Sequence, residues 1–494
     1  MIKISKKCSE LSEQKVTMIV THKYKIRPSV SQQQVIKDWI NKLRSHYNYC
    51  LRDRIEAYEQ VKYPKLGEYC DLKTKAHCYP LTCSISKNSS LGEPFKKSGK
   101  KRSAYEQQSS ELPILKKFRP WYKIIHSTVL QQNLRRLDRA FQNFFDGRGY
   151  PKFKKKHQFK SFSYPPNQVK IDDNKIYLPS IGWMRLFLSR PIREGFAIRS
   201  VTVRQKADGF YVAIGLEDKT IPDIEPIDLS QVKSVIGCDC GARPHKLLAL
   251  SNGENIPNPQ FEKQLSKRKT LRQRRASRKK RGSQNQRKAF HELARLDQKI
   301  VNQREDYHWK VAHKLHRIAD VIVMEALNIQ GMIRQCKPKQ DENGKYTKNG
   351  QSAKRALNRL IRDCSWGELK DKIRQVAEKF GRIFLEVDPK FTSQKCSNCG
   401  FKDKKNRHKE SFLCLKCDTP ADADTNAGMN LARKGIDILG ISLDTLLAVG
   451  QEVTGTSEST DARNRDISEV LASEPTNPLQ LSLFEWMNGR VIGC

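Results

Sequence analysis

Hydrophobic residues in the first half of the chain recur with two different periods. Over residues 30–60 and again over residues 120–145, apolar side chains return every three or four positions, which predicts two amphipathic helices. Residues 160–217 instead contain short hydrophobic runs separated by turn sequences such as Asp172-Asp-Asn, a pattern that favours a small antiparallel β-barrel. Residues 18–27 form another such run, and we expect them to add a strand to the same barrel.

In the second half of the chain, strand-like and helix-like segments alternate, which predicts a mixed sheet flanked by helices. Aliphatic runs at 234–239 and 246–250 predict a hairpin. A long helical period over residues 285–318 predicts a helix that leads into a strand at 321–325. The remaining expected elements are a polar loop at 335–358, a helix near 365–380, a strand at 383–387 and a helix over 425–434.

These patterns predict an α+β multidomain protein. Residues 218–230 are acidic and contain prolines, which is typical of a linker between domains. A polar stretch rich in Ser, Lys and Gly interrupts the helical region, and we expect it to be mobile. The expected parts are a β-barrel domain (1–29 and 147–217), a helical lobe (30–146) with a mobile insertion (62–115), the linker (218–230), an α/β domain (231–393 and 420–438), a zinc ribbon (394–419) and a disordered tail (439–494).

The charge of the chain is strongly unbalanced, with 93 Lys and Arg against 53 Asp and Glu and a formal net charge of +40. Such an excess repels itself, and its usual partner is a polyanion, because neutralising phosphates releases condensed counterions. No apolar run of about eighteen residues is present, so we expect no membrane partner. Residues 1–14 are too polar for a secretory signal, and scattered cysteines suit a reducing environment. We therefore expect a cytoplasmic protein that binds nucleic acid.

The densest basic segment spans residues 263–288, in which half of the side chains are Lys or Arg. Alone, such a run is also explained by a solvated or disordered arm or by a nuclear-import signal. Beside a candidate phosphodiester site, we favour contact with phosphate groups. Three tryptophans, Trp183, Trp309 and Trp366, are candidates for base stacking, but we expect them to pack in the core. The candidate phosphate contacts are Arg274, Arg275, Arg278, Lys279 and Lys280.

Four cysteines near the C-terminus have the spacing of a metal site. Cys396 and Cys399 form one Cys-x-x-Cys pair, and Cys414 and Cys417 form a second pair after fourteen intervening residues. Two such knuckles can surround one tetrahedral zinc ion. The polar segment between them has the length of a small β-ribbon. The sequence therefore predicts a zinc ribbon that holds one structural Zn²⁺.

Three acidic residues stand at the ends of regular elements. Asp239 and Glu325 each lie near the end of a hydrophobic strand, and Asp424 opens a helix after the cysteines. Two Mg²⁺ ions about 3.5–4 Å apart can drive in-line hydrolysis of a phosphodiester, and such hard cations take carboxylate ligands. Singly, each acid is explained as a strand-end residue or, for Asp424, as a helix N-cap. Together with the ribbon and the charge, the trio favours a two-metal site in which Asp239 bridges the ions.

The motifs together resemble the RuvC-like nuclease of the TnpB family, whose members are encoded by bacterial insertion sequences and are related to miniature type V CRISPR effectors. The resemblance covers residues 23–434, apart from the insertion near 62–115. Its motifs are Ile236-Gly-Cys-Asp239-Cys-Gly241, Val323-Met-Glu325-Ala, Asp388-Pro-Lys-Phe-Thr392 with the cysteines, Asp424-Thr-Asn426-Ala and, upstream, Lys23-Tyr-Lys-Ile-Arg-Pro and Gly149-Tyr-Pro-Lys-Phe-Lys.

This resemblance implies both a fold and a function. The implied fold is an oligonucleotide-binding-like β-barrel with an inserted helical recognition lobe, followed by a RuvC/RNase H-like α/β nuclease domain containing the zinc ribbon. The implied function is RNA-guided cleavage in a prokaryotic cell: a guide RNA from a transposon or a CRISPR locus pairs with double-stranded target DNA, which is then cut. On the matching positions, Asp239, Glu325 and Asp424 are the catalytic acids that hold two Mg²⁺ ions. The four cysteines hold one Zn²⁺.

Two positions depart from the family pattern. Ala326 follows the glutamate where the family commonly has an acid, and the turn after Asp239 is longer and contains Pro244. Neither change removes a catalytic acid. Two alternatives to a guided nuclease stay open. One is an RNA-guided DNA-binding protein whose nuclease is weak or silent. The other is an autonomous transposase that uses the same acids, although no separate helix-turn-helix domain is evident.

Overall fold

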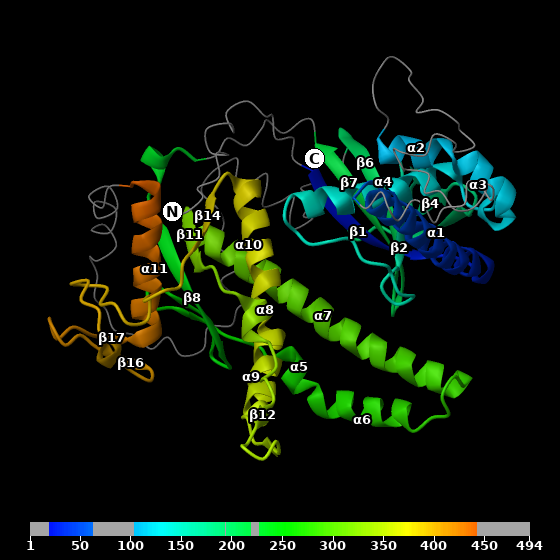
Figure 1. Ribbon diagram of the computed structural model, residues 1–494. Coiled ribbons are helices and arrows are strands. Elements are labelled where there is room, and N and C mark those ends of the chain that lie inside the picture. Colours follow the sequence, from blue (N-terminus) through cyan, green and yellow to red (C-terminus); the bar gives the residue numbers. More distant parts are fainter. Residues whose placement is uncertain (1–18, 63–102, 193, 219–226, 442–494) are drawn as a thin grey trace. The chain divides into compact units, whose positions relative to one another are not determined.

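The computed structural model describes residues 19–62, 103–192, 194–218 and 227–441 (Figure 1). These residues form two compact units, which are described separately. The first unit contains the described residues up to 218, and the second contains those from 227 onward. Several expected parts lie wholly or largely outside the described residues: the first eighteen residues of the barrel domain, most of the insertion (63–102), most of the linker (219–226) and nearly all of the tail (442–494).

The first unit is built on a seven-stranded antiparallel sheet in the order β2-β6-β7-β1-β5-β4-β3. In β1, residues alternate strictly: Tyr24 and Ile26 are buried, and Lys23 and Lys25 are exposed. β1 pairs with β5 and β7, so the early strand joins the later ones as the sequence predicts. The pairings end at β2 and β3, and closure of this sheet into a barrel stays a prediction. The strands are β1 (Ile19–Arg27), β2 (Ser161–Tyr164), β3 (Lys170–Asp172), β4 (Lys175–Leu178), β5 (Gly182–Phe187), β6 (Phe196–Lys206) and β7 (Gly209–Asp218).

Helices pack on the buried side of this sheet. α1 (Val30–Lys62) and α4 (Ser127–Phe145) contact each other and β2. Trp39 of α1 packs against β2, with its ring centroid 5.6 Å from that of Phe162 and 6.5 Å from that of Tyr164. The helical region and the sheet therefore share one hydrophobic core.

Two expectations for the helical region are wrong. The helix expected over 120–145 begins only at Ser127, because Pro120–Tyr122 form a 3₁₀ turn and the extended backbone of His126 interrupts the helical path. Part of the insertion expected to be mobile is helical instead, as α2 (Ala104–Ser110) and α3 (Leu112–Phe118). A capping box begins α2, with the Ser103 hydroxyl and the Glu106 carboxylate each accepting from the other residue's backbone N–H. This Ser-x-x-Glu signal was readable in the sequence.

The second unit contains a five-stranded mixed sheet in the order β10-β9-β8-β11-β14. β8, β11 and β14 run parallel to one another, and β9 and β10 extend the sheet in antiparallel fashion beyond β8. The hairpin of β8 with β9 is the one that the sequence predicts. The strands are β8 (Val235–Arg243), β9 (Lys246–Leu250), β10 (Asn255–Ile256), β11 (Val321–Glu325) and β14 (Ile383–Val387).

Helices lie on both faces of this sheet (Figure 1). α7 and α10 pack together on one face, where Ile322 of β11 belongs to the same core as Leu369. α11 covers the other face, where Val323 packs with Leu431. Alternate residues of each strand therefore face α11. No helix in the described part of the chain is long and apolar enough to span a membrane. The helices are α5 (Phe261–Gln264), α6 (Ser266–Ser277), α7 (Gln284–Ile318), α8 (Ile329–Met332), α9 (Gln351–Cys364), α10 (Trp366–Phe380) and α11 (Ala423–Leu439).

The segment expected to be a polar loop over residues 335–358 contains regular structure. β12 (Lys339–Gln340) and β13 (Tyr346–Thr347) form a short hairpin, and α9 already begins at Gln351. Asn358 of α9 is buried and donates from Nδ2 to the carbonyl oxygen of Ile333 (2.8 Å). Such tertiary contacts stabilise a helix whose polar sequence favours a loop.

Candidate active site and metal centre

Asp239 and Glu325 lie on neighbouring parallel strands at matching heights. In the pairing of β8 with β11, Gly237 is opposite Val323. Two further steps along the same register bring Glu325 beside Asp239. Gly237 and Val323 both face α11, since a Cβ on Gly237 would meet the α11 backbone and Val323 packs in the α11 core. Both carboxylates therefore lie on the α11 face of the sheet.

Asp424 reaches this face from the first turn of α11. The helix lies very close to β8, because a Cβ added to Gly237 would be 1.9 Å from the carbonyl oxygen of Gly428. Asp424 is one helical turn before Gly428 and is therefore on the same side of α11. The N-cap is Asp422, whose Oδ1 accepts from the backbone N–H groups of Asp424 (3.1 Å) and Thr425 (2.9 Å). Asp424 is thus a residue of the first turn and not the cap.

The surroundings of these acids favour a neutral carboxyl on β8. Burial raises the pKa of Asp239 to about 7, and the negative charges of Glu325 and Asp424 add to this effect. The guanidinium of Arg407 only partly offsets it. Burial also raises the pKa of Glu325, against the hydrogen bond that Thr392 donates to it (3.0 Å). Mutually repelling, partly buried carboxylates are a site that a bound cation would stabilise.

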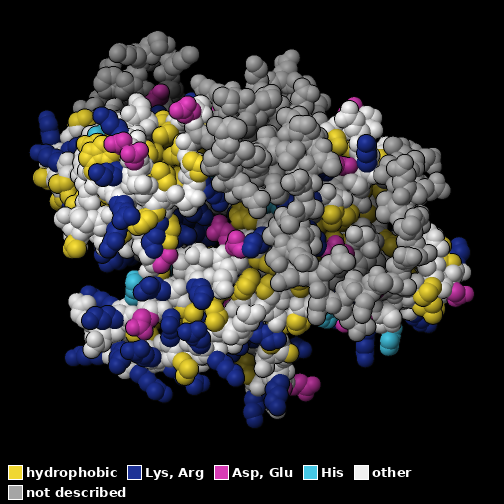
Figure 2. Space-filling model, turned by 180° about the vertical axis from the view of Figure 1, so that it is seen from behind, with side chains coloured by type: hydrophobic (Ala, Val, Ile, Leu, Met, Phe, Trp, Pro, Cys, Tyr) yellow, Lys and Arg dark blue, Asp and Glu magenta, His cyan; other side chains and the backbone are white. Residues whose placement is uncertain are grey.

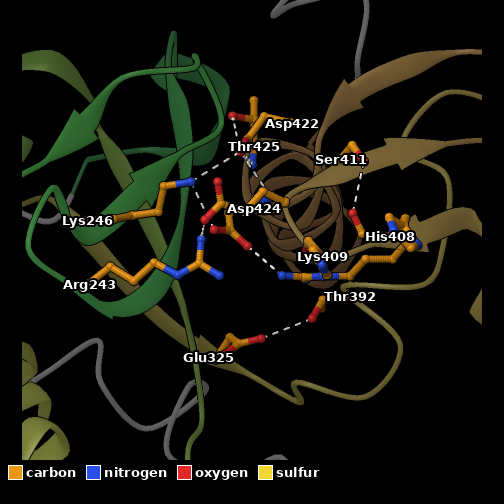
Figure 3. Close-up of polar contacts among 12 residues, drawn as sticks. Arg243, Lys246, Glu325, Thr392, His408, Lys409, Ser411, Asp422, Asp424 and Thr425 are labelled. Atoms are coloured by element: carbon orange, nitrogen blue, oxygen red, sulfur yellow. Dashed lines mark hydrogen bonds and ion pairs between the residues drawn. The ribbon is translucent and has the colours of Figure 1, made fainter.

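Two cations hold the carboxylate of Asp424. Nζ of Lys246 lies 2.9 Å from its Oδ2, and Nη2 of Arg407 lies 2.7 Å from its Oδ1. Figure 3 shows Lys246 pointing toward Asp424. Lys246 is buried and also lies 3.5 Å from Oδ1 of Asp422. Sequence reasoning missed both cations, because their partners are distant in the chain and neither belongs to a recognised motif.

Two basic residues beside the turn after Asp239, Arg243 and Lys246, reach the ribbon and α11. β8 continues to Arg243, and β9 starts at Lys246, with an irregular register before the turn. Arg243 forms an ion pair with Glu410 of the ribbon, while Lys246 reaches the first turn of α11 (Figure 3). The length of this turn was visible in the sequence, and its role as a carrier of cations was not.

The four cysteines come together in the ribbon. Their sulfur atoms all lie within 4.8 Å of one another. The separation is 3.8 Å between Cys396 and Cys417 and 3.5 Å between Cys399 and Cys414. Four sulfur atoms about 2.3 Å from one tetrahedral zinc ion would lie about 3.8 Å apart. Each knuckle also directs a backbone N–H at its first sulfur, at 3.4 Å in both. The cluster therefore fits one tetrahedral metal ion.

The acids are spaced more widely than the cysteines. In the part of the chain that the structure describes, no other group of three or more His, Cys, Asp or Glu side chains has its ligand atoms as close together as the cysteine cluster. A wider spacing suits hard cations that retain several water ligands, whereas zinc thiolate sites are compact and fully closed by protein.

Two buried asparagines attach the ribbon to α11. Asn426 accepts from the N–H of Ser397 (2.8 Å) and donates to the carbonyl oxygen of Lys395 (2.9 Å). Asn430, one turn later, donates to the same carbonyl (2.7 Å) and to that of Thr392 (2.9 Å). The ribbon and the helix that carries Asp424 are therefore one connected structure. The ribbon strands are β15 (Arg407–His408), β16 (Ser411–Leu413) and β17 (Pro420–Asp422), and β17 runs directly into α11.

The candidate phosphate contacts lie at the end of a helical hairpin formed by α6 and α7. Arg274 and Arg275 are in the last turn of α6, Arg278 is its C-cap, and Lys279 and Lys280 follow in the connection to α7. All five side chains are exposed, and Lys and Arg side chains gather over this hairpin in Figure 2. Their contact with nucleic acid stays a prediction.

The three tryptophans differ in exposure. Trp366 on α10 is buried, as the sequence predicts. Trp309 on α7 is partly buried, with Nζ of Lys372 only 4.4 Å from its ring centroid. Trp183 on β5 is 46% exposed, so the expectation that it packs in the core is wrong. Neighbouring residues of a strand face opposite sides of the sheet. Because Met184 is buried on the helix side, the side chain of Trp183 faces away from the helices.

Three segments match known family profiles. Residues 18–62 match a profile described as "Helix-turn-helix domain", residues 220–336 match the OrfB/IS605 profile described as "Probable transposase", and residues 366–431 match "Cas12f1-like, TNB domain". The first match corrects the expectation that no such domain is evident. In the described structure, however, this segment is one strand and one helix, β1 and α1.

Curated relatives match most of the chain. It is 33% identical over 327 residues to "Putative RNA-guided DNA endonuclease InsQ" of Escherichia coli (strain K12), covering 65% of this chain and 77% of the relative. It is 30% identical over 350 residues to "Putative RNA-guided DNA endonuclease" of Streptomyces pristinaespiralis, covering 68% and 79%. A solved complex of Cas12f1 with single-guide RNA and target DNA aligns at 15% identity and a TM-score of 0.39, over 84% of this chain and 99% of that one.

Proposed function

Because the chain belongs to the TnpB (IS605 OrfB) family, we propose that it is an RNA-guided DNA endonuclease. A guide RNA bound by the protein pairs with one strand of a double-stranded target, and the protein hydrolyses phosphodiester bonds of the DNA. The second unit is the nuclease, with a RuvC/RNase H-like fold. The sheet of the first unit is an oligonucleotide-binding-like domain, and the helices that pack on it are the recognition lobe.

The observation that carries this proposal is the convergence of three acids from three elements on one face of one sheet. Register brings Asp239 and Glu325 together, and the contact of α11 with Gly237 brings Asp424 to them. Each buried negative charge makes ionisation of a neighbouring carboxyl less favourable, and the raised pKa of Asp239 reflects this repulsion as well as burial. A fold gains nothing from such crowding, and strongly perturbed acids cluster at functional sites.

The donor set fits a pair of hard divalent cations. Carboxylate oxygens are the ligands that Mg²⁺ prefers, and these three are partly buried and mutually repelling. In our proposal Asp239, Glu325 and Asp424 would hold two Mg²⁺ ions, with Asp239 contributing to both and the other two acids to one each. The chemistry that the two ions supply when bound is activation of an attacking water and stabilisation of the leaving oxygen.

Two cationic side chains of the protein neutralise the Asp424 carboxylate. Without bound metal, Lys246 and Arg407 neutralise its carboxylate and keep a buried charge from being left unpaired. When Asp424 serves as a metal ligand, Lys246 still has Asp422 within 3.5 Å. Asp422 would then neutralise Lys246 at the start of α11, and the Arg407 guanidinium would be available to bind a phosphate group of the substrate.

The ribbon and the basic hairpin support the nuclease. We propose that the four cysteines hold one structural Zn²⁺, which fixes the ribbon and, through Asn426 and Asn430, the helix that carries Asp424. The exposed cations at the end of the α6–α7 hairpin hold nucleic-acid backbone. Replacing all five with Ala should weaken binding and flatten its dependence on salt, because fewer counterions are released. An unchanged salt dependence would refute phosphate contact there.

The experiment that tests this function uses the full-length protein purified with its co-expressed RNA. The bound RNA is sequenced, and DNA matched to its guide segment is offered with Mg²⁺ in a library with randomised flanking sequence. Asp239→Asn is run in parallel, because it removes one charge at nearly constant shape. We expect a defined bound RNA and DNA cuts beside a fixed flanking motif, with the cuts lost in the variant.

Other results separate the alternatives. Defined RNA and guided DNA binding without cuts would favour a silent nuclease. Absence of any discrete RNA would contradict the guided function and favour the transposase.

A further inference from the structure

The outer face of the seven-stranded sheet, which points away from α1 and α4, is both basic and aromatic. Side chains on this face alternate with the buried ones: Lys25 lies between buried Tyr24 and Ile26, and Phe187 follows buried Leu186. The same alternation assigns a set of cations and rings to this face. The cations are Lys23, Lys25, Arg27, Lys175, Arg185, Arg204 and Lys206, and the rings are Tyr177, Trp183, Phe187 and Tyr211.

Strand register arranges these side chains in rows across the sheet. Arg204 is opposite Tyr211, Tyr211 is opposite Lys25, and Lys25 is opposite Phe187. One row thus alternates cation and ring over four neighbouring strands. Because strands are about 4.8 Å apart, the two rings of this row are on the order of 10 Å apart, with a cation between them. Such spacing suits successive nucleotides, each with one base and one phosphate.

The rings on this face are accessible to a ligand. Trp183 and Phe187 are 46% and 38% exposed. Trp183 lies opposite Tyr177, with their centroids 5.4 Å apart, so these rings form a second pair beside the first row. The Arg185 guanidinium carbon lies 5.0 Å from the Phe187 ring centroid, a cation–π contact between neighbours on this face. Exposed rings that gather beside cations on one face of a sheet indicate a binding surface.

A hollow of about 220 Å³ opens on the same face beside Tyr211. Three small side chains line it, together with three cations from two strands, Lys23 of β1 and Arg204 and Lys206 of β6. No acidic residue lines it. A hollow with positive walls and one aromatic side fits a nucleotide, whose base stacks while its phosphate meets the rim. Its lining residues are Lys23, Ser161, Thr202, Arg204, Lys206, Tyr211 and Ala213.

We propose that this outer face binds an unpaired segment of RNA, with bases stacked on Tyr211, Phe187 and Trp183. Stacking on exposed rings requires bases that are free of a duplex, which favours a single strand over double-stranded DNA. The hydroxyls of Ser161 and Thr202 at the hollow each have one protein partner, Arg136 (3.3 Å) and Ser163 (2.9 Å), and keep further hydrogen-bonding capacity for a ribose 2′-OH, which favours RNA. The assignment rests on the proposed function, in which the protein works as a complex with a bound guide RNA.

The test measures binding of a short oligouridine to the full-length protein, freed of RNA, at several salt concentrations. The triple variant Trp183→Ala, Phe187→Ala, Tyr211→Ala removes the rings, and Arg204→Ala removes one cation. Trp121→Ala is the matched control, because Trp121 is also about half exposed in the same unit but lies elsewhere. Circular dichroism and thermal melting confirm that each variant is folded.

The site predicts distinct effects for the two kinds of variant. The triple variant should lose at least about tenfold in affinity with an unchanged salt slope, because stacking involves no counterion release. Arg204→Ala should lower the slope by about 0.7, the value for one phosphate of a single strand. Trp121→Ala should bind like the wild type, and oligodeoxyuridine should bind more weakly than oligouridine.

Three results would overturn the assignment. They are wild-type binding by the triple variant, an equal loss in Trp121→Ala, and binding of oligodeoxyuridine as tight as that of oligouridine. If the triple variant binds oligouridine like the wild type but loses affinity for a short DNA duplex measured in parallel, this face is a duplex-binding surface instead. The readout needs no cleavage, so a failure of the nuclease proposal and a failure of this one are separable.

Discussion

Gly237 of β8 and Gly428 of α11 are in backbone contact. A Cβ on Gly237 would lie 1.9 Å from the carbonyl oxygen of Gly428 and 2.6 Å from the nitrogen of Ala432, distances that real atoms do not reach. The helix can rest on the strand only because Gly237 has no side chain. This contact sets the height of α11 above the sheet, and with it the distance of Asp424 from Asp239.

Replacing this glycine should separate the acids. In Gly237→Ala, α11 must move outward, which we expect to lower the free energy of unfolding by at least about 1–3 kcal/mol. Cleavage should fall about a hundredfold, since a shift of about 1 Å misplaces a catalytic group. Thermal melting and cleavage rates measure both effects. Gly367→Ala on α10 is the control, because its added Cβ would be 3.7 Å from the nearest atom. Wild-type behaviour of Gly237→Ala would contradict the contact.

Lys246 should matter most when no metal is present. In Lys246→Met, Asp424 keeps Arg407 but loses its buried cation, and we expect the metal-free protein to lose about 1–3 kcal/mol of stability. Added Mg²⁺ should restore part of this loss, because it supplies the missing positive charge. Melting temperature against Mg²⁺ concentration measures the effect. Lys314→Met, which breaks a half-exposed pair with Glu254, should cost less than about 1 kcal/mol and show no such rescue.

The attachment of the ribbon to α11 can be tested at Asn426. In Asn426→Ala, the Ser397 N–H and the Lys395 carbonyl lose a buried partner, at an expected cost of about 1–3 kcal/mol. Amide hydrogen exchange should then rise in the ribbon and in the first turn of α11, while one zinc ion per chain is retained. Asn398→Ala, an exposed change within the same knuckle, should leave exchange unchanged. Equal exchange in both variants would show that the ribbon is held by other contacts.

Acid should destabilise the first unit through His46. Burial lowers the pKa of His46 to about 4, and its Nδ1 accepts from Asn133 (3.0 Å), so the folded state holds it neutral. The unfolded chain, with a pKa of about 6.5, binds the proton first as pH falls, so stability is full above about 6.5 and declines toward 4. Between pH 7 and pH 5 the loss is about 2 kcal/mol.

Denaturant midpoints at the two pH values measure this loss. His46→Gln should show a smaller pH dependence than the wild type. His157→Gln, an exposed histidine in the same unit, should keep the wild-type dependence. An identical pH dependence in His46→Gln and the wild type would show that this histidine does not control acid stability.

Features with short-range signals could be predicted from the sequence. Hydrophobic runs alone assigned Glu325 to the end of its strand, which is confirmed. They also assigned Asp239 to a strand, but its position near the strand end is wrong, because β8 continues to Arg243. The two Cys-x-x-Cys knuckles fixed the composition of the metal cluster by their spacing. The long helical period of α7 was also readable, with its start within one residue of the observed Gln284.

Features that depend on distant partners could not be predicted. Lys246 and Arg407 meet Asp424 only after the sheet, the ribbon and α11 have assembled, and no local pattern marks either cation. The outer face of the first sheet was missed for the same reason, because its rows join strands from both ends of the unit. Trp183 illustrates the error: its hydrophobicity predicts burial, whereas its place in the alternation of β5 exposes it.

The central claim is that Asp424, and not its neighbour Asp422, is a catalytic acid. The two lie two residues apart, and Asn substitution removes one charge from each while preserving the capping ability of Asp422. The decisive measurement is the rate of Mg²⁺-dependent cleavage of guide-matched DNA by Asp424→Asn and Asp422→Asn side by side. We predict a loss of about a thousandfold, equivalent to about 4 kcal/mol, for Asp424→Asn and less than about tenfold for Asp422→Asn. Near-normal cleavage by Asp424→Asn would contradict the proposed site.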